Sequence, residues 1–557
     1  MITIPSADTT STAQIAIRHP MVSLQAAEWR FYGLVILGLQ LIIWAPIIFA
    51  FVTAPPDRQF MGVVDGVADH NQYFAWMRSF THSNLAANRL TPEANEPAFF
   101  NLLWWVTARF SVITGVSYIT AYTMLRLIAI LTLLFSLLFF LSLINDRPRQ
   151  RQIAFWLIVT SGGLGVIWIF VKYAVGLPEA PFPISIYTAE PNTLMIMQAF
   201  PHFTMALALI ITIFSLMLLA WRNKQSRYAV AAGFVGAILA LQHAYDLLIV
   251  YSALGVFGLL IWWRDRRFPT LLLRHGVILV LLSAPGALYL AFLVTNEPIW
   301  GRKLEQFDNA GVFTPNPILL VILLGVPLLL AIAGLRREMF RSADDRQIFL
   351  VSWFVTHFGL MYLPLKFQIH MLLGLQVPMM ILAAIAIDER LIPALRQRGR
   401  WALYTGLIAV FGLSIITSIY IQGWRFVYLS RYEQPLHLTN DEIAALQWLQ
   451  SQATAEDVVL ADIEFGQFVP VWSDARAYVA HWAGTLDFFT KRENSRIVLD
   501  PDTPADKRRQ LLAEFHVSYV VMRDRDGDRV AFGRQSASDL EPVYENATVS
   551  IYRFRAR

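Results

Sequence analysis

The pattern of apolar positions divides the 557-residue chain into two parts. Up to about Trp424, apolar runs long enough to cross roughly 30 Å of hydrocarbon recur many times. Beyond that point, short apolar runs alternate with polar helical stretches, which is typical of a soluble α/β domain. The runs predict about eleven membrane-spanning helices, at Phe31–Thr53, Ser117–Leu143, Ile153–Val175, Pro201–Trp221, Tyr228–Gln242, Asp246–Trp263, Thr270–Val294, Pro317–Leu335, Phe349–Pro364, His370–Ile387 and Trp401–Gly423.

The predicted fold class is therefore an α-helical polytopic membrane protein with a small C-terminal α/β domain. We expect a cytoplasmic tail at residues 1–30, a transmembrane domain at 31–424 with a large first outer loop at 54–116, and an extracytoplasmic domain at 425–557. Ala98–Ile113 is apolar and aromatic, but a crossing there would move the next basic loop to the outer side. We interpret it as an amphipathic helix with Trp104 and Trp105 at the membrane interface.

The charges of the loops predict the orientation. Cytoplasmic loops are rich in Lys and Arg, and five loops fit that description: Asn145–Gln152, Arg222–Arg227, Arg264–Arg267, Arg336–Arg346 and Asp388–Arg400. The loops between them, and the C-terminal domain, are then outside. We expect a multi-pass protein of a bacterial-type cytoplasmic (inner) membrane with its N-terminus inside.

Composition excludes several classes of protein. With 56% hydrophobic and 15% charged residues, the chain is not a soluble enzyme, since soluble domains carry roughly 25% charged residues. The net charge is +9 before Arg425 and −4 from there on, so the basic excess belongs to the membrane part and indicates orientation, not a nucleic-acid partner. Cysteine is absent, which excludes disulfides and thiolate metal sites. A P-loop motif is also absent, which disfavours an ATP-driven pump.

Polar residues at the outer ends of the apolar runs are the candidates for function, because ionisable groups at membrane depth are costly. In the first outer loop, Asp69 and Tyr73 share a helical face with Trp76, Met77 and Phe80. Asp69 would point with this aromatic stripe toward the membrane, or it would only cap an interfacial helix. Asp65 lies four residues earlier on the same loop, and the sequence leaves open which of the two acids faces a cavity.

The other outer turns carry acids, imidazoles and cations. Each has an alternative structural explanation: helix capping, hydrogen bonding at the interface for His202, or snorkelling to headgroups for Lys366. Arg126 differs, because it lies inside an apolar run and needs an internal partner or an anionic ligand. Together these groups predict a cavity open to the outer face, formed by Asp69, Tyr73, Arg126, Glu190, Asn192, His202, His243, Asp246, Lys366 and His370, with His481 and Trp482 from the C-terminal domain. A carboxylate there could take a proton from an acceptor hydroxyl while cations hold an anionic phosphate.

The chain resembles the GT-C superfamily of integral membrane glycosyltransferases. The long first outer loop with its acidic helix is one point of similarity, and Asp69-His70-Asn71-Gln72-Tyr73 is similar to the D-E-x-x-Y pattern of the protein O-mannosyltransferase-like and aminoarabinose-transferase-like branches, with His70 in place of the Glu. The stretches EPNT at 190–193, PHF at 201–203, HAYD at 243–246 and GLQVP at 374–378, and His481-Trp482, are similar to uncharacterised bacterial members.

The resemblance implies a polyprenyl-phosphate-linked sugar donor and an inverting transfer to a glycan, lipid or protein acceptor. It implies that Asp69 is the general base and that Lys366, His370, Arg126 and His202 bind the donor phosphate. Tyr73, Glu190, Asn192, His243, Asp246, His481 and Trp482 are then expected to bind substrate. Some branches of the superfamily use a divalent metal held by paired acids, but the motif here has His70 beside Asp69 in place of a second acid, so we expect neither a metal nor another cofactor.

Two further interpretations belong to other classes. A transporter or flippase for a lipid-linked glycan would need access from both sides and often shows paired broken helices, which the sequence does not indicate. A non-catalytic scaffold of a polysaccharide assembly complex would keep the fold without turnover.

Overall fold

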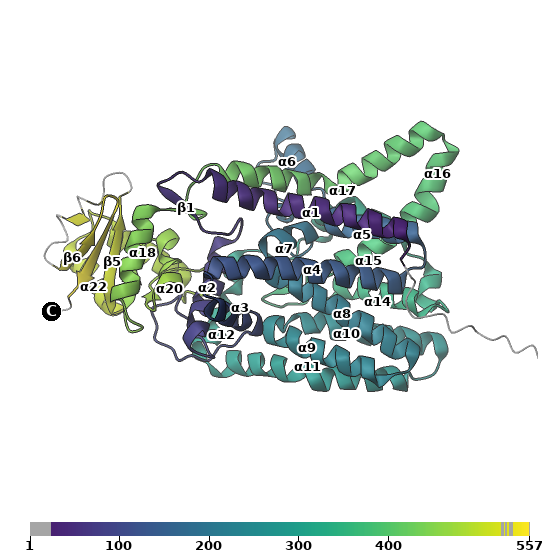
Figure 1. Ribbon diagram of the computed structural model, residues 1–557, viewed down its shortest axis with the longest axis horizontal. Coiled ribbons are helices and arrows are strands. Elements are labelled where there is room, and N and C mark those ends of the chain that lie inside the picture. Colours follow the sequence, from purple (N-terminus) through teal and green to yellow (C-terminus); the bar gives the residue numbers. More distant parts are fainter. Residues whose placement is uncertain (1–23, 525–528, 530–531, 534–538, 556–557) are drawn as a thin grey trace, which may run out of the picture.

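The computed structural model describes residues 24–524, 529, 532–533 and 539–555. Long helices run side by side along the long axis of the molecule, and the C-terminal domain caps one end of this bundle (Figure 1). The predicted fold class is confirmed. Most of the tail that we expect at residues 1–30 lies outside the described residues.

The membrane part contains eight helical segments that are long and apolar enough to cross a bilayer, within the described part of the chain. They are α1 (Ala26–Thr53), α4 (Tyr118–Ile144), α8 (Pro201–Asn223), α10 (Asp246–Asp265), α11 (Thr270–Asn296), α13 (Pro317–Gly334), α17 (Arg400–Leu429) and the stretch Gln368–Gln397, which includes α15 (Gln376–Ala386) and α16 (Ile392–Gln397). A bent pair, α5 (Pro148–Thr160) and α6 (Gly165–Ala174), makes a ninth if it is counted as one span.

The other two predicted crossings are helical but fall outside this set. One is α14 (Asp345–Leu360), whose 16 residues extend only about 24 Å at the rise of an α-helix. The other is α9 (Ser226–His243), which packs against α8 and α11. By length and composition alone, eight or nine of the described helical segments qualify as spans, where the sequence predicts about eleven.

The bend between α5 and α6 has a local cause. The two helices meet at 55°, where the sequence predicted one straight run. Gly163 has a φ of +73°, and a Cβ there would lie 2.0 Å from the carbonyl oxygen of Leu323. Gly325 faces Gly163 with a φ of +70°. Two glycines thus allow the chain after α5 to press against the α13 backbone, which turns α6 away.

The five basic loops meet at the end of the bundle opposite the C-terminal domain. Ion pairs join Arg149 to Asp388, Arg336 to Glu389, Arg264 to Asp345 and Arg346 to Asp146, and the Trp221 indole donates to Asp345 just before the remaining loop. Buried Arg151 also pairs with Glu28 at 2.7 Å. The Lys/Arg-rich loops, which were predicted to share one side of the membrane, therefore lie at one end of the structure.

The C-terminal domain follows the predicted α/β pattern. Its sheet has the order β4-β3-β5-β7-β6, formed by β3 (Val458–Leu460), β4 (Arg476–Ala477), β5 (Val517–Arg523), β6 (Leu540–Glu545) and β7 (Val549–Phe554). The helices are α18 (Asn440–Gln452), α19 (Ile463–Gly466), α20 (Val469–Trp472), α21 (Phe488–Leu499) and α22 (Ala505–Glu514). Thr439 and Glu442 form a capping box at the start of α18.

The first outer loop joins the domain to the bundle. Its strand β1 (Arg58–Phe60) pairs antiparallel with β2 (His437–Thr439), just before α18. The helices α2 (Val67–His82) and α3 (Leu102–Thr114) follow in the same loop, and α12 (Pro298–Glu305) lies beside them from a later outer loop (Figure 1). With 13 residues α3 is shorter than a membrane span, and Trp104, which was predicted to lie at the interface, is instead buried and stacks on Tyr73.

Candidate active site

Asp69 lies in the first turn of α2. The helix begins after Gly66, which takes a left-handed φ of +55°. Trp76, Met77 and Phe80 are buried, as the predicted face requires, while the Asp69 side chain keeps 31% of its surface exposed. The carboxylate is therefore anchored by its helix and still reachable by a ligand.

His481 in the C-terminal domain fixes the Asp69 carboxylate. The Nδ1 atom of His481 accepts the backbone N–H groups of Ala483 and Gly484, at 3.1 and 2.9 Å. Since Nδ1 acts as an acceptor, the ring proton sits on Nε2, which donates to Asp69 Oδ1 at 2.9 Å. A neutral imidazole thus holds one carboxylate oxygen, and Asp69 Oδ2 remains for another partner.

The protonation of this pair follows from its surroundings. Burial tends to raise the pKa of Asp69, but the hydrogen bond and charge of His481, helped by His70 and the Trp482 side chain, lower that pKa below its ordinary value. Burial also lowers the pKa of His481. Asp69 is therefore a carboxylate at neutral pH, and His481 stays neutral beside it.

Asp65 and Asp69 turn toward different partners. Asp65 pairs with Arg425 of α17 at 3.2 Å and accepts the backbone N–H of Gly66 at 2.9 Å. Asp69 instead meets His481 of the C-terminal domain. The two acids, which the sequence left as alternatives, therefore differ in their partners: Asp65 pairs with an arginine, and Asp69 with a histidine.

His70, which replaces the family's Glu, acts on the backbone. Its two ring nitrogens lie 2.7 Å from the carbonyl oxygen of Gly66 and 2.8 Å from that of Ala199, and the side chain is fully buried. Ala199 ends α7 (Thr193–Ala199), so His70 ties the start of α2 to the chain just before α8. His70 therefore helps to fix the position of Asp69.

Lys303 of α12 is a buried cation that the sequence analysis missed. Its ammonium donates to Gln72 and lies 4.5 Å from the ring centre of Trp76 and 4.9 Å from that of Trp300. Burial lowers the pKa of Lys303 to about 7, although the charge of Asp69 acts in the opposite direction. The spacing of Trp300 and Lys303, one helical turn apart in an outer loop, was the signal available.

Tyr73 and His202 continue the site toward the membrane. The Tyr73 hydroxyl lies 3.3 Å from His202 Nε2, and its ring stacks on Trp104 with a centroid distance of 4.6 Å. His202 stands in the first turn of α8, and its Nδ1 is buried without a partner among the described residues. A helix N-terminus with a free imidazole nitrogen favours an anion.

The turn between α9 and α10 forms a hydrogen-bonded chain. Asp246 Oδ2 lies 2.6 Å from His243 Nδ1, and the Tyr245 hydroxyl lies 2.5 Å from His243 Nε2. Asp246 is fully buried, and Tyr245 is close enough to Asp69 and Glu190 to experience their charges. Tyr245 belongs to the quoted HAYD stretch, but it was absent from the predicted site.

Glu190 and His370 form a second acid–imidazole pair. Glu190 Oε1 lies 2.6 Å from His370 Nδ1, and the His370 ring stacks on Tyr245 with centroids 4.9 Å apart. Asn192, predicted to bind substrate, instead caps α7 by accepting the backbone N–H of Met195 at 3.1 Å. These side chains form one connected cluster, which we call the Asp69 site: Asp69, Tyr73, Glu190, His202, His243, Tyr245, Asp246, Lys303, His370 and His481.

Two predicted cations have other partners. Lys366 pairs with Asp308 at the surface, with half of its side chain exposed. Arg126 is fully buried, and its ring contacts are Trp44, at 5.8 Å, and Tyr122, at 5.2 Å. Its Nε and Nη1 atoms have no partner in the described part of the chain, and Arg425 is its charged neighbour.

The described residues contain no group of three or more His, Asp or Glu side chains arranged to hold a metal ion. The expected metal independence remains a prediction.

The fold is shared with solved membrane proteins. The oligosaccharyltransferase of Archaeoglobus fulgidus, tethered with an acceptor peptide, matches with a TM-score of 0.54 and 12% identity over 92% of this chain and 72% of that chain. The complex of AglB from the same organism with an inhibitory peptide and a dolichol-phosphate matches with a TM-score of 0.51 and 12% identity, over 90% and 70%. ArnT from Cupriavidus metallidurans in the apo state has a TM-score of 0.48 at 12% identity, over 94% and 98%.

Neither a protein-family model nor a curated protein sequence matches the chain. At 12% identity the structural likeness concerns the fold, and its coverage of 92% of the chain takes in the bundle, the first outer loop and the C-terminal domain together. The predicted resemblance is thereby confirmed at the level of architecture: the protein is a multi-pass membrane protein that shares the fold of the A. fulgidus oligosaccharyltransferase.

Proposed function

We propose that the protein is a membrane glycosyltransferase, which transfers a sugar from a polyprenyl-phosphate-linked donor to an acceptor hydroxyl at the outer face of the membrane. The observation that carries this proposal is the ionised, partly exposed Asp69, held by neutral His481 in a cluster that contains several imidazoles and the buried amine of Lys303. The A. fulgidus neighbours, whose structures hold an acceptor peptide or a dolichol-phosphate, support substrates of this class.

Asp69 acts as the general base in this mechanism. Its Oδ2 atom accepts the proton of the acceptor hydroxyl while the oxygen attacks the anomeric carbon, and the bond from that carbon to the phosphate oxygen breaks. The attack comes from the face opposite the leaving phosphate, so the anomeric configuration inverts. His481 is a positioning residue, because it holds Oδ1 and keeps Asp69 ionised.

The donor phosphate is held by the basic groups of the Asp69 site. His202 offers its unpartnered Nδ1 and the α8 N-terminus, and His370 and Lys303 add further basic groups. We leave Lys366 and Arg126 out of this group, since Lys366 is paired with Asp308 at the surface and the guanidinium of Arg126 lies over the rings of Tyr122 and Trp44 and 3.5 Å from the carbonyl oxygen of Gly62. Tyr73, Tyr245 and Trp482 present rings and polar atoms to the sugar or the acceptor.

The end that carries the C-terminal domain then faces outward. The Lys/Arg-rich loops at the opposite end favour a cytoplasmic location for that end, in a bacterial-type inner membrane. The sugar and the acceptor remain to be identified.

The decisive experiment compares two acids on one loop. Membranes containing the full chain are supplied with radiolabelled polyprenyl-phosphate sugars, and transfer to endogenous acceptors is measured. Asp69→Asn keeps the hydrogen bond from His481 but cannot take a proton, so transfer should fall by about 10²–10⁴-fold. Asp65→Asn is the matched control and should retain most of the activity.

Retention of activity by Asp69→Asn would exclude Asp69 as the base. If no sugar is transferred by the parent protein while labelled lipid changes leaflet in reconstituted vesicles, a flippase replaces the transferase. A folded parent protein without either activity would favour the scaffold.

A further inference from the structure

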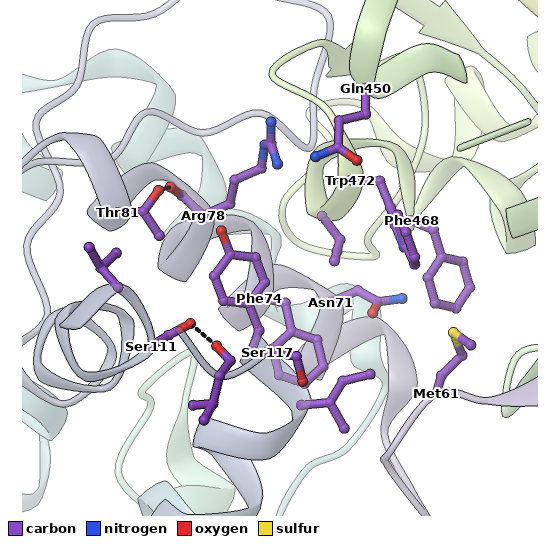
Figure 2. A pocket seen from close by; sticks show the side chains of 15 residues that line it. Met61, Asn71, Phe74, Arg78, Thr81, Ser111, Ser117, Gln450, Phe468 and Trp472 are labelled. Atoms are coloured by element: carbon purple, nitrogen blue, oxygen red, sulfur yellow. Dashed lines mark hydrogen bonds between the residues drawn. The ribbon is translucent and has the colours of Figure 1, made fainter. Parts of the chain in front are cut away.

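A cavity lies on the face of α2 opposite Asp69. It has a volume of about 510 Å³ and is bounded by α2, by the corner between α3 and α4, and by α18 and α20 of the C-terminal domain (Figure 2). Asn71, Phe74 and Arg78 face it from α2. Asp69 and Tyr73 lie on the other face of the same helix, so this cavity is separate from the Asp69 site.

The lining of the cavity is mostly apolar. Side chains from three parts of the chain contribute to it: Phe74 of α2, Val116 and Ile119 of the corner, and Phe468 and Trp472 of the C-terminal domain. Figure 2 shows Phe74, Phe468 and Trp472 around the cavity. A cavity of this size lies within the usual range for small-molecule sites, roughly 300–1,000 Å³.

One polar group in this lining lacks a partner. Asn71 is only 2% exposed, and its Nδ2 has no hydrogen-bond partner among the described residues. The neighbouring hydroxyls are already engaged: Ser111 donates to Val116 O at 2.6 Å and Thr81 to Arg78 O at 2.7 Å. Since a buried amide without a partner is costly, the cavity favours a ligand that offers a hydrogen-bond acceptor beside an apolar chain.

The surroundings indicate where this ligand comes from. Ser117, in the lining, caps α4, which is long and apolar enough to cross the membrane. Val112, also in the lining, is 53% exposed, and its neighbour Ile113 is 82% exposed. An apolar surface therefore runs from the cavity to the side of the protein that lies at the outer leaflet.

We propose that this cavity binds one acyl chain of a membrane glycerophospholipid, with an ester carbonyl accepting a hydrogen bond from Asn71 Nδ2. The chain enters past Val112 and contacts Phe468 and Trp472. The bound lipid then lies between the back of α2 and the C-terminal domain, and this binding does not depend on the proposed transfer reaction.

A photo-crosslinking experiment tests the site. The full chain is reconstituted into phosphatidylglycerol vesicles that contain a trace of phosphatidylglycerol with a diazirine at the end of one acyl chain. After illumination, crosslinked peptides are mapped by mass spectrometry. The peptide that contains Phe468–Trp472 should be labelled, although it belongs to the C-terminal domain.

Three variants make the test specific. Val116→Trp fills the cavity and should abolish labelling of this peptide, whereas Asn71→Leu, which loses one hydrogen bond, should reduce it about fivefold. Phe135→Trp changes an exposed apolar residue of α4 that does not line the cavity and should leave labelling unchanged. Melting temperatures close to that of the parent protein show that each variant is folded.

Two outcomes overturn the proposal. One is an unlabelled Phe468–Trp472 peptide in the parent protein, or equal labelling in folded Val116→Trp. The other is displacement of the label by a water-soluble glycan or peptide acceptor, which would assign the cavity to the acceptor.

Discussion

Replacing His481 by Phe removes the donor that keeps Asp69 ionised, while the ring volume is retained. In the parent protein the Nε2–H of His481 donates to Asp69 at 2.9 Å, and the pKa of Asp69 lies below its ordinary value of about 3.9. Without this donor, burial of the carboxyl group dominates. We therefore expect the pKa of Asp69 to rise in His481→Phe.

The size of the rise follows from the strength of the lost hydrogen bond. A hydrogen bond to a charged group contributes about 1.5–3 kcal/mol, which corresponds to about one to two pKa units at about 1.36 kcal/mol per unit. Because 31% of the Asp69 side chain is exposed, water can replace part of the lost donor. The lower end of this range, about one unit, is therefore the expected shift.

The pH dependence of kcat/KM for sugar transfer measures this shift. The acidic limb of the profile, where Asp69 becomes protonated and inactive, should move to higher pH by about one unit in His481→Phe. His481→Gln can still donate a hydrogen bond and should restore the limb toward its parent position. His516→Asn, which changes an exposed histidine of the same domain, is the control and should not move it.

An unchanged acidic limb in folded, active His481→Phe would refute the reasoning. It would mean either that Asp69 is not the group that titrates or that the hydrogen bond from His481 does not set its pKa.

Three further substitutions test other parts of the site. Burial lowers the pKa of Lys303 to about 7 in the folded protein, so the charged form destabilises the fold, and this cost fades as the pH rises toward the unfolded pKa of about 10.4. Lys303→Met should therefore raise the melting temperature of the ligand-free protein at pH 7 and raise KM for the donor. A lower melting temperature would contradict the assignment. Arg126→Met removes a buried, incompletely paired charge and should stabilise the ligand-free protein by about 1–4 kcal/mol in denaturant titrations, with KM for the donor unchanged. A large rise in KM would instead indicate that Arg126 binds the donor phosphate. Tyr245→Phe removes the hydroxyl that contacts His243 Nε2 and should lower kcat by about tenfold or more with little change in melting temperature, and equal kcat values would remove Tyr245 from the mechanism.

The sequence was informative wherever a pattern repeats over many residues. Apolar runs located the helices, basic loops sorted their ends, and alternation of short apolar and polar stretches indicated the strands of the C-terminal domain. The bend between α5 and α6 escaped prediction because it depends on Gly163 and Gly325, which meet only after folding. Fewer helices than predicted meet the length and composition of a span, because α14 is short and α9 carries polar residues at its ends.

The candidate site was partly predictable for a similar reason. Acids and imidazoles at the outer ends of the helices identified Asp69, Glu190, His202, His243, Asp246, His370 and His481. Lys366 carries the same charge at the same membrane side as Lys303, and only the folded chain distinguishes them: Lys366 meets Asp308, whereas Lys303 is buried over Trp76. The choice between Asp65 and Asp69 likewise depended on which partner, Arg425 or His481, each acid reaches.

The contact between Asp69 and His481 joins positions 412 residues apart. During synthesis, α2 therefore emerges from the ribosome long before the imidazole that completes its carboxylate. A nascent chain inserted in the bilayer but lacking its last segment would contain the whole helical bundle, with an Asp69 carboxylate that His481 does not yet hold. The pairing of Asp69 with His481 is therefore one of the last steps in the synthesis and folding of the chain.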